Sequence, residues 1–235
     1  MKLVLWDIDR TLVYTGNIDR QVYREAFTAV VGRPPEALPA KGTGATMPLA
    51  VRELLLSNHV PADRIDTLAD SIIEQLPQRL NAHRDLIARE GSVLPGARAA
   101  LAAVHDDELL LPSVVTGNLR GNALVKLSEL DLDQYLDMEV GAYASDHAHR
   151  PSLVRIAQER ATSAYGYAFN RANTIIIGDS LQDVITGQQG GAQVIGVASG
   201  TTSAERLMAA GADHVLPDLT DTDQLLHLLT HRDSR

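Results

Sequence analysis

The sequence predicts an α/β fold built around a parallel sheet, and two observations carry this prediction. Short apolar runs, rich in β-branched residues and bounded by polar residues, recur along the chain, as expected for buried parallel strands. They are residues 2–6, 113–115, 174–177 and 194–197. From residue 93 onward such runs alternate with segments of helical periodicity, which is the order that a parallel sheet requires.

The first strand is separated from the rest of the sheet by a stretch without a strand pattern, residues 16–88. We expect helices over 18–31, over 48–59, and from about residue 61 to the residue before Pro77, because apolar side chains recur there at helical spacing. Gly32 and the two prolines that follow should end the first of these helices. The predicted organisation is a core formed by residues 1–15 and 89–235, interrupted by a helical segment at 16–88.

The end of the first predicted strand carries two carboxylates. Asp7 follows the apolar run directly, Asp9 comes two residues later and Thr11 two after that. Ligands of open α/β sheets gather at the carboxyl ends of the strands. Two like charges about 4 Å apart repel by roughly 1–4 kcal/mol, so a divalent cation is the natural partner for this pair. A solvated Asp-x-Asp turn is the alternative that these residues alone leave open.

Two later strand ends repeat the pattern. Residues 178–183 (Gly-Asp-Ser-Leu-Gln-Asp) follow the strand predicted at 174–177 and place Asp179 and Asp183 one helical turn apart. Residues 116–118 (Thr-Gly-Asn) follow the strand predicted at 113–115. A hydroxyl followed by Gly and Asn lets backbone N–H groups approach an oxyanion closely. The sequence therefore predicts a polar site at one edge of the sheet.

In their order, spacing and placement, these motifs resemble the haloacid dehalogenase (HAD) superfamily of hydrolases, and the resemblance covers nearly the whole chain. Residues 93–96 (Val-Leu-Pro-Gly), 190–192 (Gly-Gly-Ala) and 211–216 (Gly-Ala-Asp-His-Val-Leu) are similar to the subgroup of phosphoglycolate-phosphatase-like enzymes. The resemblance implies a Rossmann-like, three-layer core with a parallel sheet. It also implies that residues 16–88 are an inserted, all-helical cap of the C1 type.

The resemblance implies phosphoryl transfer through an aspartyl phosphate, with Mg²⁺ as cofactor and a small phosphorylated metabolite as substrate. Asp7 is then the nucleophile, and Asp9 is the acid that protonates the leaving alkoxide and the base that activates water. Asp7, the backbone carbonyl of Asp9, and Asp179 would hold the cation, and Asp183 would support it. All of these ligands are hard oxygens, which suit Mg²⁺.

The resemblance further implies that Thr116 and the amides near Gly117 and Asn118 bind the non-bridging oxygens of the phosphate. The family's motifs also include a lysine before a proline, and here Arg150 precedes Pro151. We therefore predict that Arg150 is the catalytic cation. Lys126 is not expected to fill this role, because it falls well past the turn that would face the phosphate.

A second departure from the family pattern is Arg10, which stands where a glycine is usual. If the backbone there requires a positive φ, Arg10 bears strain. Otherwise its side chain reaches the mouth of the site or solvent, and we favour solvent or a surface pairing. Within the predicted cap, Lys41 and Thr46 are candidates for touching substrate, with a plain lead-in to a helix as the alternative. Residues 146–149 (Asp-His-Ala-His) suit no common zinc spacing, and we expect a solvated loop.

Composition is consistent with a globular enzyme and excludes several other classes. The net charge of −9 argues against nucleic acid or an anionic membrane as a partner. The absence of cysteine excludes disulfides, thiolate metal sites and a cysteine nucleophile. No signal-peptide pattern precedes Asp7 and no apolar run approaches the length of a membrane span, so a cytoplasmic protein is expected.

Three other functions compete with the phosphatase. A sugar-phosphate phosphomutase of the same fold would retain every motif. A 2-haloacid dehalogenase would share the fold and Asp7, but it would not need Asp9 as an acid or an acidic metal site. A non-catalytic phospho-accepting receiver also carries strand-end carboxylates, yet it would be about half this length, without a helical insertion.

Overall fold

Six parallel strands form the central sheet in the order β5-β4-β1-β6-β7-β8. The computed structural model describes residues 1–40, 44–200 and 202–231. Within these, the strands are β1 (Lys2–Trp6), β4 (Leu110–Thr116), β5 (Ala142–Tyr143), β6 (Thr174–Gly178), β7 (Gln193–Val197) and β8 (His214–Leu216). β1 lies between β4 and β6, with Trp6 paired to Val114 on one side and Ile177 on the other. The predicted α/β fold with a parallel sheet is confirmed.

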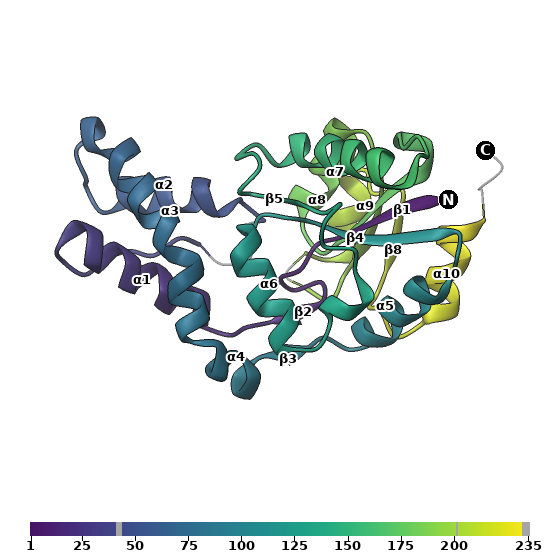
Figure 1. The fold of residues 1–235 in the computed structure, drawn as a ribbon, viewed down its shortest axis with the longest axis horizontal. Coiled ribbons are helices and arrows are strands. Elements are labelled where there is room, and N and C mark those ends of the chain that lie inside the picture. The colour runs from purple at the N-terminus through teal and green to yellow at the C-terminus, as the bar shows by residue number, and fades with distance from the viewer. Residues whose placement is uncertain (41–43, 201, 232–235) are drawn as a thin grey trace.

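Helices cover both faces of this sheet, which makes the core a three-layer structure (Figure 1). Alternate residues of β1 belong to different clusters: Val4 and Trp6 pack with α5 (Ala97–Asp106) and α10 (Thr222–Thr230), and Leu3 and Leu5 pack with α7 (Arg150–Tyr165). This alternation is the period of two expected of a strand. Three further helices complete the core: α6 (Arg120–Glu129), α8 (Leu181–Gly190) and α9 (Ala204–Ala209). Two short 3₁₀ turns span Asp133–Tyr135 and Arg171–Asn173.

The helical insertion extends from one side of this core (Figure 1). It contains α1 (Ile18–Val31), α2 (Met47–Ser57), a 3₁₀ turn (Ala62–Arg64), α3 (Ile65–Ala82) and α4 (Arg84–Glu90). α1 has the expected bounds and ends at Gly32, whose φ of 84° is left-handed. In Figure 1, α6 lies between the insertion and the sheet.

The third helix of the insertion departs from the sequence expectation. α3 was expected to end before Pro77, but it continues to Ala82. A proline inside a helix removes one backbone hydrogen bond and strains the preceding turn. The burial of apolar side chains offsets the cost of this proline, because Leu76 before it and Leu80 after it are fully buried. Pro77 itself lies against Gly121 at the start of α6, where a Cβ would come within 2.8 Å of it.

A two-stranded antiparallel ribbon joins the two ends of the insertion. β2 (Val13–Tyr14) pairs with β3 (Ser92–Val93), so the chain enters and leaves the helical segment side by side. Neither this ribbon nor α4 was predicted, because runs of two strand residues and a seven-residue helix carry too little periodicity to be recognised. Among the described residues, none of the helices combines the length and hydrophobicity required to cross a membrane.

Candidate active site

The site lies where β1, β4 and β6 end. Asp7 follows β1, Thr116 is the last residue of β4, and Asp179 follows β6. The backbone N–H of Asp7 donates to the carbonyl of Ile177 at 2.9 Å, so strand pairing continues up to the first carboxylate. Because parallel strands end at the same edge of a sheet, motifs more than 100 residues apart in the sequence meet here, as expected.

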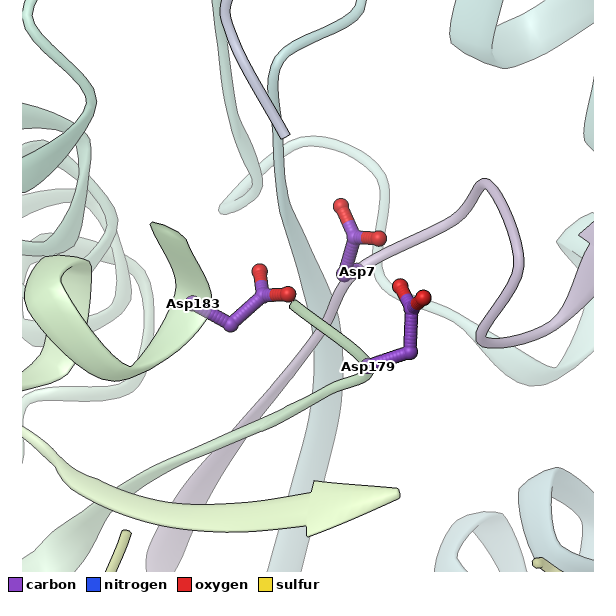
Figure 2. Close-up of side chains that lie close together, drawn as sticks. All are labelled: Asp7, Asp179 and Asp183. Atoms are coloured by element: carbon purple, nitrogen blue, oxygen red, sulfur yellow. The ribbon is translucent and has the colours of Figure 1, made fainter. Parts of the chain in front are cut away.

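Three carboxylates converge at this edge (Figure 2). One oxygen each from Asp7, Asp179 and Asp183 lie within 4.8 Å of one another, and these side chains are buried. Asp7 comes from the end of β1, Asp179 from the turn after β6, and Asp183 from the first turn of α8. Asp183 is fixed by Ser180, whose hydroxyl and backbone N–H donate to Asp183 Oδ2 at 2.6 and 2.9 Å.

Two glycines leave room for these carboxylates. A Cβ on Gly178 would lie 2.3 Å from Cγ of Asp183, and a Cβ on Gly200 would lie 1.7 Å from Oδ2 of Asp179. Both separations are far below van der Waals contact. The glycines therefore permit an approach of backbone to carboxylate that any other residue would block.

The electrostatics of this cluster favour a cation. Burial, followed by the charges of Asp183 and Asp179, raises the pKa of Asp7 well above its usual range. Burial and Asp183 raise the pKa of Asp179 to about 7. Three negative charges in a buried site cost free energy unless positive charge accompanies them. The donor set consists only of hard oxygens, which fits Mg²⁺ or a similar divalent ion.

Arg150 lies beside the cluster. Its Nη2 donates to Oδ1 of Asp7 at 2.6 Å and to Oδ1 of Asp183 at 2.5 Å, and its Nη1 donates to the carbonyl of Gly44 at 2.7 Å. Burial alone would lower the pKa of this guanidinium, but Asp183 and Asp7 raise it, so the side chain stays charged. Arg150 is the first residue of α7 and Pro151 follows it, as expected. It therefore joins two carboxylates of the core to the chain segment that leads into α2.

The Thr-Gly-Asn motif faces the same space. Oγ1 of Thr116 accepts from the side-chain amide of Asn118 at 2.8 Å and from its backbone N–H at 3.2 Å. The carbonyl of Gly117 accepts from the backbone N–H of Met47 at 2.7 Å. A Cβ on Gly117 would lie 2.7 Å from the carbonyl oxygen of Ala45, so a glycine is required where the two segments cross.

Asp9 lies outside the three-carboxylate cluster, and its side chain binds a residue that sequence reasoning had set aside. Nζ of Lys126 donates to both oxygens of Asp9, at 2.8 and 2.9 Å. Lys126 does not contact Asp7, whose partner is Arg150 as predicted, but its contact with Asp9 was not foreseen. A signal was present: with Ala123, Leu127 and Leu130, Lys126 falls on the apolar face of its helix, where an unpaired cation is costly.

Arg10 adopts a φ of 67°, so a non-glycine residue bears the left-handed conformation at this position. Its guanidinium carbon lies 5.5 Å from the centroid of the Tyr14 ring, a cation–π contact. The side chain is half-buried and borders the cavity of the site, where its charge opposes the rise in the pKa of Asp179. Arg10 therefore pairs with Tyr14 and also reaches the mouth of the site, which was the alternative to solvent or a surface pairing.

A cavity of about 180 Å³ opens over these residues. It is bordered by the strand-end residues and by side chains of the helical insertion, among them Arg20, Tyr23, Met47 and Ala50. Thr46 is buried, and its hydroxyl donates to the carbonyl of Ala148 at 2.8 Å, which is a structural contact rather than one to a ligand. Lys41, the other candidate in this segment, lies outside the described residues.

The loop at residues 146–149 is distinct from this site. Asp146 accepts from both terminal nitrogens of Arg160, at 2.9 and 2.6 Å, and His147 and His149 are exposed. The ion pair gives Asp146 a structural role, and the two histidines lie in a solvated loop, as expected.

Comparisons with known proteins agree with this fold. Residues 149–222 match a protein family described as HAD-hydrolase-like. A "Probable phosphatase IndB" of Dickeya dadantii is 24% identical over 97% of this chain and 94% of that protein. A hydrolase from Pseudomonas syringae superposes with a TM-score of 0.70 at 21% identity, over 98% of this chain and 100% of that chain. A "predicted phosphatase" from Clostridium acetobutylicum superposes with a TM-score of 0.69 at 19% identity, over 96% of this chain and 98% of that chain.

These two solved structures share the fold of this chain, an α/β core with a helical insertion after the first strand. The match to the HAD-hydrolase-like family covers residues 149–222, and the order of the strand-end motifs agrees with this likeness.

Proposed function

We propose that the protein is a Mg²⁺-dependent phosphatase that hydrolyses a small phosphorylated metabolite through an aspartyl phosphate on Asp7. The observation that carries this proposal is the buried cluster of Asp7, Asp179 and Asp183 with Arg150 bonded to Asp7. A carboxylate nucleophile must approach a phosphate dianion, and it can do so only where positive charge is gathered beside it. The resemblance to phosphoglycolate-phosphatase-like enzymes supports the same function.

The first half of the proposed reaction transfers the phosphoryl group to the protein. A carboxylate oxygen of Asp7 forms a bond to phosphorus as the bond from phosphorus to the ester oxygen breaks. Asp9 gives its proton to the departing alkoxide. Arg150 holds the Asp7 carboxylate in place, and Thr116 and the amides near Gly117 and Asn118 bind the non-bridging oxygens.

The second half releases phosphate. Asp9, now a carboxylate, takes a proton from a water molecule whose oxygen attacks the phosphorus of the aspartyl phosphate, and Asp7 is regenerated. Asp7, Asp179, Asp183 and the backbone carbonyl of Asp9 would hold Mg²⁺. When bound, the ion neutralises negative charge between Asp7 and the phosphate.

A small substrate is proposed because the cavity is about 180 Å³ and is bordered by both the core and the helical insertion. We infer that residues 16–88 form a cap over the core, which excludes water as lids do and admits small esters rather than folded phosphoproteins. The cytoplasmic location stays a prediction from the sequence.

Phosphate release from a panel of sugar, nucleotide and small-acid phosphates tests the proposal, with Asp7→Asn as the variant. The variant should keep the fold and lose activity by several orders of magnitude, at about 1.4 kcal/mol of barrier for each factor of ten. Rapid acid quenching of the wild-type enzyme should trap phosphate on Asp7. Substantial turnover by Asp7→Asn, or full wild-type activity in excess chelator, would contradict the assignment. Conversion of one sugar phosphate into its isomer without phosphate release would indicate a phosphomutase.

A further inference from the structure

Lys126 is the feature of this site that the proposed reaction leaves unused. Its side chain is fully buried in α6. Nζ lies 2.8 and 2.9 Å from the two oxygens of Asp9, 2.9 Å from Oδ2 of Asp19 and 3.0 Å from Oδ1 of Asn118. A buried ammonium is costly unless it is paired, and here it meets two carboxylates and an amide oxygen.

These contacts occupy the whole donor capacity of the ammonium group. Lysine has three N–H donors, and Lys126 has four acceptors within 3.0 Å. Burial alone would lower the pKa of Lys126, but Asp19 and Asp9 raise it above its usual range, so the group keeps its charge. Lys126 has no donor to spare for a phosphate, and its role must act through the residues that it holds.

The contacts also distinguish the two oxygens of Asp9. Oδ2 accepts from Lys126 and from the side-chain amide of Asn118 at 2.8 Å, whereas Lys126 alone donates to Oδ1 in the part of the chain that the structure describes. A carboxylate oxygen offers two lone-pair positions. Oδ2 is therefore filled and Oδ1 keeps one position, which leaves it as the oxygen able to exchange a proton with substrate or water.

The contact with Asp19 reaches the helical insertion. Asp19 lies in the first turn of α1, and its Oδ2 accepts both from Lys126 and from the hydroxyl of Thr15 at 3.0 Å. Lys126 thus connects Asp19, at the start of the insertion, to the carboxylate of Asp9.

We propose that Lys126 is a positioning residue, which fixes the Asp9 carboxylate so that Oδ1 exchanges protons with the reacting groups and which ties that carboxylate to α1 through Asp19. The proposal rests on the phosphatase function proposed above and deepens it. It gives Arg150 and Lys126 different roles: Arg150 holds the nucleophile Asp7, and Lys126 holds Asp9, the acid and base.

The test compares two esters that differ in their need for an acid. Para-nitrophenolate leaves phosphorus without a proton, whereas the alkoxide of glycerol phosphate must be protonated as it departs. The value of kcat/KM reports the steps up to alcohol release and is independent of the later hydrolysis of the aspartyl phosphate. Lys126→Met should lower kcat/KM for glycerol phosphate by about a hundredfold and that for para-nitrophenyl phosphate by less than about threefold.

Three further variants make the comparison decisive. Lys126→Gln keeps a hydrogen-bond donor, so it should retain part of the activity on glycerol phosphate; it also answers the question if Lys126→Met does not fold. Adding Lys126→Met to Asp9→Asn should cause no further loss, because both changes remove the same contribution. Lys2→Met, at the far end of β1, is the matched control and should leave both values unchanged.

Equal losses of kcat/KM for the two esters in the Lys126 variants would overturn the proposal, and so would activity equal to that of the wild type. A further large loss on adding Lys126→Met to Asp9→Asn would also overturn it. Failure of the wild-type enzyme to release phosphate with Mg²⁺ from these two esters and from every member of the panel would instead refute the phosphatase function itself.

Discussion

Replacing Asp179 with asparagine removes one of the three negative charges that meet at the end of β6. The side chain is 3% exposed, and its pKa is raised from 3.8 to about 7. Asparagine has nearly the same shape and still offers an oxygen to the hydroxyl of Thr11, which lies 3.4 Å from Oδ1 of Asp179. The substitution therefore tests the charge while leaving the packing of the site almost unchanged.

The sign of the effect follows from proton linkage. Between pH 4 and pH 7 the folded state binds a proton at Asp179 that the unfolded chain has released, so the stability of the metal-free wild type falls as the pH rises through this range. A pKa raised from 3.8 to about 7 corresponds to about 4 kcal/mol, which sets the upper limit of the loss. In metal-free buffer at pH 8, Asp179→Asn should therefore be more stable than the wild type by up to that amount.

Urea denaturation at pH 8 and at pH 4, with and without Mg²⁺, measures the prediction. The gain in Asp179→Asn should disappear at the lower pH, where the aspartate is protonated as well. Mg²⁺ at pH 8 should stabilise the wild type strongly and the variant weakly, because binding to the folded state alone adds stability. Asp70→Asn, an exposed position, is the control and should change nothing. A variant no more stable than the wild type without metal, or one stabilised equally by Mg²⁺, would refute the reasoning.

Three further predictions follow from other contacts. Arg150→Ala should lower kcat/KM for any substrate by about a hundredfold, because the partner of Asp7 is lost, and Arg150→Lys should recover part of it in the same steady-state assay. Gly200→Ala should weaken Mg²⁺ binding in a calorimetric titration by about tenfold, because its Cβ displaces the Asp179 carboxylate. Burial raises the pKa of Asp146, but hydrogen bonds from Arg160 and the Tyr143 amide outweigh it, so that the pKa is lowered. Asp146→Asn should therefore lower the free energy of unfolding at pH 7 by less than about 1 kcal/mol, measured by urea denaturation. That cost should vanish as the pH falls below the usual carboxylate range, and a constant difference across pH would contradict it.

The parts of the fold that follow from local patterns could be predicted from the sequence. The helix at Ile18–Val31 has its expected bounds because apolar periodicity and a terminal glycine both act within the segment. The continuation of α3 through Pro77 could not be predicted, because burial on the surface of α6 outweighs the local preference of proline. The short ribbon of β2 and β3 depends on pairing across 79 residues from Val13 to Val93 and leaves no local trace.

The site residues also differ in whether the sequence could predict their positions. The residues placed at strand ends, among them Asp7 and Asp179, could be located because the topology of a parallel sheet brings strand ends together. Lys126 could not, because its place depends on the length and direction of one side chain inside the folded protein. Reading its charge against the apolar face of its own helix would have identified it as a buried cation in need of partners.

The position of β1 between β4 and β6 also decides the order in which the protein can assemble. On the ribosome, β1 emerges before either neighbour, and Trp6 pairs with Ile177 only after 171 further residues have been made. Until then Leu3, Val4 and Leu5 form an apolar strand with unpaired edges, which is the kind of segment that aggregates. The helices of the insertion contact one another locally and can form first. The edge of the sheet that carries the three-carboxylate cluster is therefore completed late, after β4 and β6 have been made and can pair with β1.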